Sequence, residues 1–143
     1  MSERAISKVL SANDSGETGG HQAGLLIPKQ KQILSFFPVL DASRLNPRAH
    51  LQFEDDAGGF WEFAFIYYNN RLFGGTRNEY RLTRMTRYIR ESGLVAGDEV
   101  LMRRDENGNY FVSYRRSNAK QVSINTAGET VIRLAAGWKV IDI

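Results

Sequence analysis

The chain has 143 residues, of which 42% are apolar and 24% charged, as is ordinary for a globular domain with its own core. It contains no cysteine and only two histidines, which excludes disulfides, thiolate metal sites and a zinc site made of histidines alone. No apolar run approaches the roughly 20 residues of a membrane-spanning helix, and the N-terminus lacks the pattern of a secretory signal. We therefore expect a cytoplasmic protein without membrane contact.

The N-terminal part of the sequence predicts short strands and one short helix. Ile33, Phe36 and Phe37 recur at helical spacing and Pro38 follows them, so a short amphipathic helix is expected over 29–37. The other elements expected here are a strand or frayed lead-in at 2–10, a glycine-rich loop at 11–22, a short buried strand at 24–28, a strand at 51–54 and a turn at 55–59.

The segment 60–68 is the strongest strand signal in the chain. Trp61, Phe63, Phe65 and Tyr67 alternate onto one face. The other face carries Ala64, Ile66 and Tyr68, so we expect both faces to be at least partly covered. Leu82, Met85 and Ile89 then fall at i, i+3 and i+7, which predicts a helix that Gly93 ends. The opposite side of that helix would carry Arg81, Arg84, Arg87 and Arg90.

The C-terminal part predicts further short strands. Segments 99–103 and 110–115 form an expected hairpin, because the turn between them contains the Asn-Gly signal. Three more strands are expected at 121–125, 130–134 and 138–143. Seven or eight short strands with two short helices are typical of a β-barrel or sandwich that the helices close. We find no repeat or linker that would divide the chain.

Positive charge is concentrated between residues 71 and 90. Six arginines and one acid, Glu79, give this segment a net charge of +5, against +3 for the whole chain. Arginine pairs bidentately with phosphate and with the O6/N7 edge of guanine, and glutamate accepts from the N4 amine of cytosine. Because an acid weakens a purely electrostatic binder, the polar segment 77–81 favours base reading. A solvated helix face with internal ion pairs is the alternative.

Three other features have a functional and a structural interpretation. The glycines of 13–22 resemble a phosphate cradle but lack the Gly-Lys-Ser/Thr of a P-loop, and His21 is a groove contact, a catalytic base or neither. The acids at 54–56 either ligate Mg²⁺ or form a solvated turn. The aromatic side chains of 60–68 either stack on single-stranded bases or fill the core.

Two blocks of sequence resemble the N-terminal effector domain of EcoRII-type restriction endonucleases. One is 10–28, and the other is 67–84, with Tyr-Tyr-Asn-x-Arg-x-Phe-Gly-x-Thr-Arg-Asn-Glu-x-Arg-x-Thr-Arg. The passage from Ile27-Pro28 to Phe37-Pro38 also resembles the strand-to-helix passage of plant B3 domains. The resemblance implies a mainly β fold, a B3-like open seven-stranded β-pseudobarrel with two short α-helices. Residues 1–143 would be a single DNA-binding domain from the N-terminal part of a longer endonuclease.

In that family the two blocks form an N-arm and a C-arm that grip the DNA major groove. The base-reading residues expected from this resemblance are His21, Arg77, Asn78, Glu79, Arg81, Asn13, Asp14 and Gln22. The expected contacts to the DNA backbone are Arg71, Thr76, Tyr80, Arg84, Arg87 and Lys29.

The sequence departs from the family pattern at three positions. Leu26, Gly75 and Tyr80 stand where a relative has a tyrosine and two lysines. The loss of two cations should weaken backbone contacts and the salt dependence of binding without changing the base code. The family recognises CC(A/T)GG, so the resemblance implies this site or a related one.

The sequence therefore predicts sequence-specific binding of double-stranded DNA, as the recognition domain of a type II (IIE-like) restriction endonuclease in the bacterial cytoplasm. The domain would have no active site and no cofactor of its own, and Mg²⁺ is expected only for a catalytic nuclease domain elsewhere in the same parent chain. Two alternatives are a B3-type transcriptional regulator without a nuclease, and a small metal-dependent nuclease that uses Glu54, Asp55 or Asp56.

Overall fold

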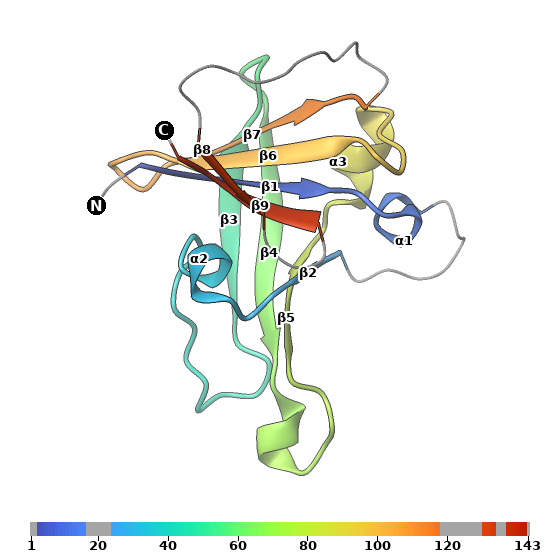
Figure 1. The fold of residues 1–143 in the computed structure, drawn as a ribbon. Helices are drawn as coiled ribbons and strands as arrows, with labels where there is room; N and C mark the ends of the chain where they lie inside the picture. The colour runs from blue at the N-terminus through green and yellow to red at the C-terminus, as the bar shows by residue number, and fades with distance from the viewer. Residues whose placement is uncertain (1–2, 17–23, 118–129, 134–136, 143) are drawn as a thin grey trace.

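A single curled sheet with short helices at its edges makes up the structure (Figure 1). The computed structural model describes residues 3–16, 24–117, 130–133 and 137–142. The strands in these ranges are β1 (Arg4–Val9), β2 (Leu25–Ile27), β3 (Arg48–Glu54), β4 (Phe60–Tyr68), β5 (Glu79–Thr83), β6 (Glu99–Arg104), β7 (Tyr110–Arg115), β8 (Thr130–Arg133) and β9 (Trp138–Asp142). The helices are α1 (Ala12–Ser15), α2 (Lys31–Leu34), the 3₁₀ helix η1 (Asn70–Phe73) and α3 (Thr86–Glu91).

Two groups of antiparallel strands meet at one short parallel junction. The strand order is β2-β5-β4-β3-β7-β6-β1-β9-β8. β3 and β7 pair only at Phe53 with Tyr110 and at Glu54 with Phe111, whereas every other neighbouring pair is antiparallel. In the described ranges the edge strands β2 and β8 do not pair with each other, so the sheet curls around the core without closing into a complete barrel. The mainly β, open pseudobarrel architecture is thus confirmed, with nine strands in the described ranges where the resemblance implied seven.

The core lies inside the curl and is built largely from aromatic side chains. Phe63 and Phe65 of β4 are fully buried on the inner face, and Ala64 and Ile66 are buried on the outer face. Both faces of the strongest predicted strand are therefore covered, as expected. Burial of each such aromatic or aliphatic side chain contributes about 1.5–3 kcal/mol to the free energy of unfolding. Phe63 and Phe65 thus fill the core, Trp61 packs against it, and Phe60 is exposed.

The hairpin of β4 and β5 projects from this body and carries the C-arm, the block of residues 67–84. Figure 1 shows the hairpin, in green, extending well beyond the other strands to the turn that carries η1. The rings of Tyr67 and Tyr80 stack across its two strands with centroids 4.2 Å apart, and Tyr80 stacks in turn on Phe65. A continuous aromatic stack therefore connects the C-arm to the core.

A buried asparagine fastens the C-arm just before η1. Asn69 is fully buried, and its Nδ2 donates hydrogen bonds to the carbonyl oxygens of Ala42 and Arg44. Its Oδ1 accepts from the backbone N–H of Asn46 at 2.7 Å. A buried amide that makes three hydrogen bonds is strongly position-specific. The loop before β3 thus supports the C-arm from one side.

The helix expected from the spacing of Leu82, Met85 and Ile89 is wrong in its first half. Leu82 lies in β5, where it pairs with Leu25 on one side and Phe65 on the other. Arg84 has a φ of 67°, which ends the strand, and α3 begins only at Thr86. The three apolar side chains that suggested a helix, Leu82, Met85 and Ile89, are all buried. Leu82 reaches the core from β5, Met85 from the position just before α3, and Ile89 from α3 itself. The apolar spacing therefore indicated which residues are buried but did not indicate a continuous helix.

Several other boundaries differ from the prediction. The expected loop at 11–22 opens with α1, which Ser11 and Asp14 stabilise through a capping box. β3 begins at Arg48, three residues before the predicted strand, and α2 is shorter than the predicted helix. The hairpin of β6 and β7 is confirmed. The strand predicted at 121–125 lies outside the described residues.

Candidate nucleic-acid interface

One carboxylate joins two arginines on the outer face of the C-arm. Glu79 Oε2 accepts hydrogen bonds from Arg81 Nε at 2.7 Å and from Arg77 Nη2 at 2.8 Å. Glu79 and Arg81 share a face because alternate residues of a strand point to the same side, and Arg77, just before β5, reaches the same carboxylate. The bonds from Arg81 and then Arg77 hold the pKa of Glu79 below its ordinary value, so the carboxylate is ionised at neutral pH.

Each arginine of this group has a second support. The Arg77 guanidinium carbon lies 3.9 Å from the centre of the Tyr68 ring, a cation–π geometry. Arg81 Nη1 donates to the carbonyl oxygen of Gly24 at 3.4 Å. These contacts fix the direction of both guanidinium groups before any partner binds. The remaining N–H groups of each planar fork can still address an external acceptor.

Hydrogen bonds within the turn hold the end of the C-arm in place. Asn70 Oδ1 accepts from the Arg77 N–H at 2.6 Å, and the Arg71 N–H donates to the Arg77 carbonyl at 2.9 Å. The Gly75 N–H donates to the Asn70 carbonyl at 2.7 Å. Hydrogen bonds therefore close the turn that contains η1. The side chains of Arg71 and Thr76 are exposed on this turn.

A pocket lies between the C-arm and the segment around α1. It has a volume of about 490 Å³ and is lined by Lys8, Val9, Ser11, Asn13, Asp14, Leu26, Arg81 and Gly137. Asn13 and Arg81, which the sequence assigned to different arms, thus face the same space. Lys8 donates to Asp14 Oδ2 at 2.8 Å in a nearly buried ion pair that fastens α1 to β1. Asp14 Oδ2 also accepts from the Ser11 N–H, so this oxygen already accepts two hydrogen bonds within the protein.

The other predicted contact residues are more dispersed. Tyr80 belongs to the aromatic stack, and burial raises the pKa of its hydroxyl. Arg84 lies 3.7 Å from Glu62, and Arg87 pairs with Glu91 at 2.6 Å within α3. Lys29 is exposed just after β2. His21 and Gln22 lie outside the described residues, and Asn78 accepts a hydrogen bond from the Tyr67 hydroxyl at 2.7 Å.

The acids at 54–56 form a turn. Asp55 accepts from the backbone N–H groups of Ala57 and Gly59 and from Trp61 Nε1 at 2.8 Å. These bonds, the Trp61 bond foremost, hold the pKa of Asp55 below its ordinary value. Within the described ranges, no group of three or more His, Cys, Asp or Glu side chains is placed to hold a metal ion. The same part of the chain has no helix long and apolar enough to cross a membrane.

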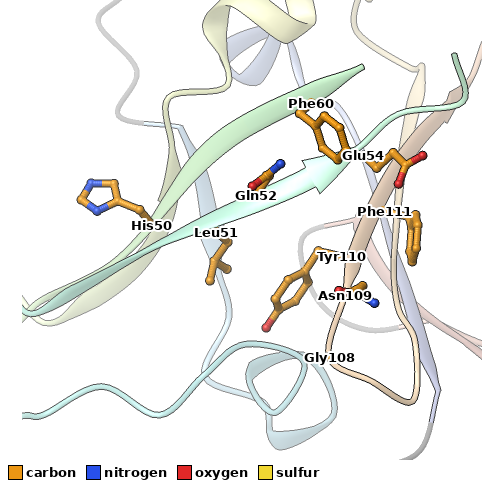
Figure 2. A pocket seen from close by; sticks show the side chains of 9 residues that line it. All are labelled: His50, Leu51, Gln52, Glu54, Phe60, Gly108, Asn109, Tyr110 and Phe111. Carbon is orange, nitrogen blue, oxygen red and sulfur yellow. The ribbon is translucent and has the colours of Figure 1, made fainter. Parts of the chain in front are cut away.

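A second pocket opens where β3 and β7 separate. Its volume is about 560 Å³, and its lining runs from His50 to Glu54 on β3 and from Gly108 to Phe111 around the start of β7. Figure 2 shows His50 and Glu54 near opposite ends of this lining, with Gln52 between them. The two groups are four positions apart along the strand, which corresponds to about 13 Å between their backbone positions. This is too far for the two to share a proton at one reacting atom.

Two parts of the site were missed by reasoning from the sequence. Tyr68, which supports Arg77, was assigned only to the outer face of a strand, and Leu26 was noted only as a departure from a family pattern. The register explains both roles. Tyr68 pairs with Glu79, and Leu26 pairs with Arg81, so each lies beside a member of the charged group. No local sequence signal gives this register.

The strand order of the open sheet, the short helices and the pocket between the C-arm and α1 define a B3-like pseudobarrel. A solved structure described as an Arabidopsis FUS3–DNA complex has this fold. It superposes with a TM-score of 0.61 at 22% sequence identity, covering 78% of this chain and 96% of that one.

A family model described as the N-terminal domain of restriction endonuclease EcoRII matches residues 2–96. The chain belongs to this family. The type II restriction enzyme EcoRII of Escherichia coli is 49% identical over 82 residues, which are 54% of this chain and 20% of the enzyme. A B3 domain-containing protein of Arabidopsis thaliana is 33% identical over 119 residues, 80% of this chain and 44% of that protein. The chain thus spans about a fifth of the first relative and less than half of the second.

Proposed function

We propose that this domain binds double-stranded DNA and reads a short sequence through the major groove with two arms. The observation that carries the proposal is the group of Arg77, Glu79 and Arg81, which is prearranged on the C-arm beside a pocket shared with Asn13. Membership of the EcoRII N-terminal family supports it.

The chemistry of the group suits a run of G·C pairs. Each guanidinium can pair with the O6 and N7 acceptors of a guanine, and the carboxylate can accept from the N4 amine of a cytosine. Glu79 Oε2 already holds the two arginines, whereas Oε1 has no hydrogen bond among the described residues. Adjacent guanine and cytosine edges would therefore complete the group. The family site CC(A/T)GG, or a close relative of it, contains such edges.

Contacts to phosphates would set the register of the arms on the duplex. Arg71 and Thr76 are exposed on the C-arm, and Lys29 is exposed near β2. Arg84 and Arg87 have acidic neighbours, so each would have to exchange an ion pair for a phosphate. Such contacts carry no sequence information but make binding depend on salt. Binding itself needs no metal ion in this account.

In the parent protein the domain would act as the recognition or effector domain of an EcoRII-type restriction endonuclease of the bacterial cytoplasm. Residues 1–143 would form one binding unit, and a catalytic nuclease domain that uses Mg²⁺ would lie elsewhere in the same chain. A B3-type regulator without a nuclease is the alternative, supported by the likeness to plant B3 proteins. A reading frame that continues into a nuclease domain would decide between them.

A binding panel tests the proposal. Dissociation constants are measured for a preferred duplex and for every single-base variant, with the unaltered protein and with Glu79→Gln. We expect Glu79→Gln to lose about 1–3 kcal/mol of discrimination at one base pair and little elsewhere. The matched control is Glu106→Gln, the same change at an exposed position in the turn between β6 and β7, away from the C-arm. Unchanged discrimination in Glu79→Gln would refute base reading by this group.

A further inference from the structure

The end of the C-arm exposes two large apolar side chains side by side in sequence. Leu72 and Phe73 lie in η1 with 60% and 51% of their surface exposed. Most other large apolar side chains in the described ranges are buried, and an exposed apolar pair at the end of a projecting hairpin has no role in the core. Exposed apolar groups that adjoin polar binding residues are a common mark of a contact surface.

The pair is held in place, so its exposure is not a consequence of a loose turn. η1 ends at Gly74 with a φ of 94°, and Asn70 is hydrogen-bonded on both its backbone and its side chain. A β-carbon at Gly75 would lie 2.6 Å from Asn70 Cγ, so the turn closes this tightly only with glycine there. The two apolar side chains are therefore presented in a fixed geometry.

Their neighbours indicate what the pair meets. Arg71 precedes it, and the charged group of Arg77, Glu79 and Arg81 begins four residues after it, so the end of the arm carries positive charge. That charge suits DNA better than a second apolar protein surface. In the major groove, the apolar group that base edges offer is the C5-methyl of thymine.

We propose that Leu72 and Phe73 contact thymine methyl groups beside the bases that the C-arm reads, and so extend its specificity. This inference rests on the proposed function. Under this proposal Leu72 and Phe73 make apolar contacts with the DNA. The group of Arg77, Glu79 and Arg81 makes the hydrogen bonds. The two would act on neighbouring base pairs, because both lie in the same arm.

Replacing thymine by deoxyuridine tests the proposal, since this removes the methyl group alone. Each thymine of the preferred duplex and its flanks is replaced in turn, and binding is measured for the unaltered protein and for Leu72→Ala/Phe73→Ala. We expect one or two replacements to weaken binding of the unaltered protein about fourfold, the value of one buried methyl group. The double variant should bind the thymine and uracil duplexes equally. Val95→Ala, which changes a 51% exposed apolar side chain between α3 and β6, should keep the sensitivity.

The outcomes separate this inference from the proposed function. If the protein prefers one duplex but no uracil replacement changes its affinity, the methyl contact is wrong and base reading stands. If Leu72→Ala/Phe73→Ala keeps the sensitivity to uracil, the methyl is read by other residues. If the double variant instead converts a dimer to a monomer without DNA, the pair is a protein interface. A protein with no duplex preference would overturn both proposals.

Discussion

Arg81 Nε and Glu79 Oε2 lie 2.7 Å apart on one face of β5, in a pair that is partly shielded from solvent. The bond directs the Arg81 fork while leaving its terminal nitrogens able to donate outward. An arginine fixed in this way loses less conformational entropy when it meets a base than a free one would. The acid in the arm therefore orders the two arginines, and in the proposed function it also reads a base.

The first prediction concerns this geometry. Arg81→Lys keeps the charge but removes the Nε donor and the planar fork. We expect it to lose discrimination at one base pair by about 1–3 kcal/mol, nearly as much as Arg81→Ala. The salt dependence of binding should remain close to that of the unaltered protein. Competition gel shifts at several salt concentrations measure both quantities, and full specificity in Arg81→Lys would contradict the bidentate role.

The second prediction concerns a phosphate contact. Arg71 is exposed at the end of the C-arm, so Arg71→Ala should weaken all duplexes alike and lower the slope of log K against log salt by about 1. Arg103→Ala is the control, because Arg103 lies on β6 and pairs with Glu3, away from both arms. A loss confined to one base pair in Arg71→Ala would assign it to base reading instead.

The third prediction concerns the close approach of β2 to β5. Gly24 has a φ of 75°, and a β-carbon there would overlap the carbonyl oxygen of Leu82. Gly108, in the turn of the β6–β7 hairpin, has a φ of 85° and open space around it. Gly108→Ala should cost about 1 kcal/mol of the free energy of unfolding, the usual penalty for alanine at positive φ.

Gly24→Ala should cost clearly more, because the strand must also move, and it should displace Leu26 and the pocket between the arms. Urea unfolding of the two variants gives the comparison. Equal costs would show that β2 can shift away from β5 without loss.

The fourth prediction concerns acid stability. Glu99 is buried, which pushes its pKa up, but the bonds from Lys139 at 2.7 Å and Ser7 at 2.6 Å outweigh burial and hold the pKa below its ordinary value of 4.5. A lowered pKa in the folded state stabilises the fold above the unfolded pKa, and this stability is lost as the pH falls through the folded value.

Unfolding free energies measured from neutral pH to below pH 4.5 should therefore fall less steeply for Glu99→Gln than for the unaltered protein. Glu106→Gln, in the exposed turn of the β6–β7 hairpin, is the control and should leave the slope unchanged. An identical slope in Glu99→Gln would mean that other carboxylates govern acid unfolding.

The sequence predicted the parts of the fold whose signals are local. The aromatic alternation of β4 and the Asn-Gly turn between β6 and β7 each depend on neighbouring residues, and both are confirmed. The stretch from Leu82 to Ile89 was misassigned because its apolar spacing fits a helix. The pairing of Leu82 with Phe65 and Leu25 overrides that spacing, and such long-range pairing is invisible in a single sequence.

The candidate site was predictable in composition but not in arrangement. The mixture of arginines with Glu79 indicated base reading, and the family resemblance supplied the second arm. That one carboxylate oxygen binds both Arg77 and Arg81, or that Lys8 holds α1 through Asp14, follows only from the register and the buried ion pair. Asn69 likewise looked like one polar residue among several, yet it is the buried anchor of the C-arm.

Selection of bound duplexes from a random pool tests the central claim most directly. The unaltered protein and Glu79→Gln are taken through parallel rounds with sequencing of the bound DNA. The account predicts one short, G·C-containing motif for the unaltered protein, and a motif degenerate at one base pair for Glu79→Gln. No enriched motif, or the same complete motif from both proteins, would contradict base reading by the group of Arg77, Glu79 and Arg81.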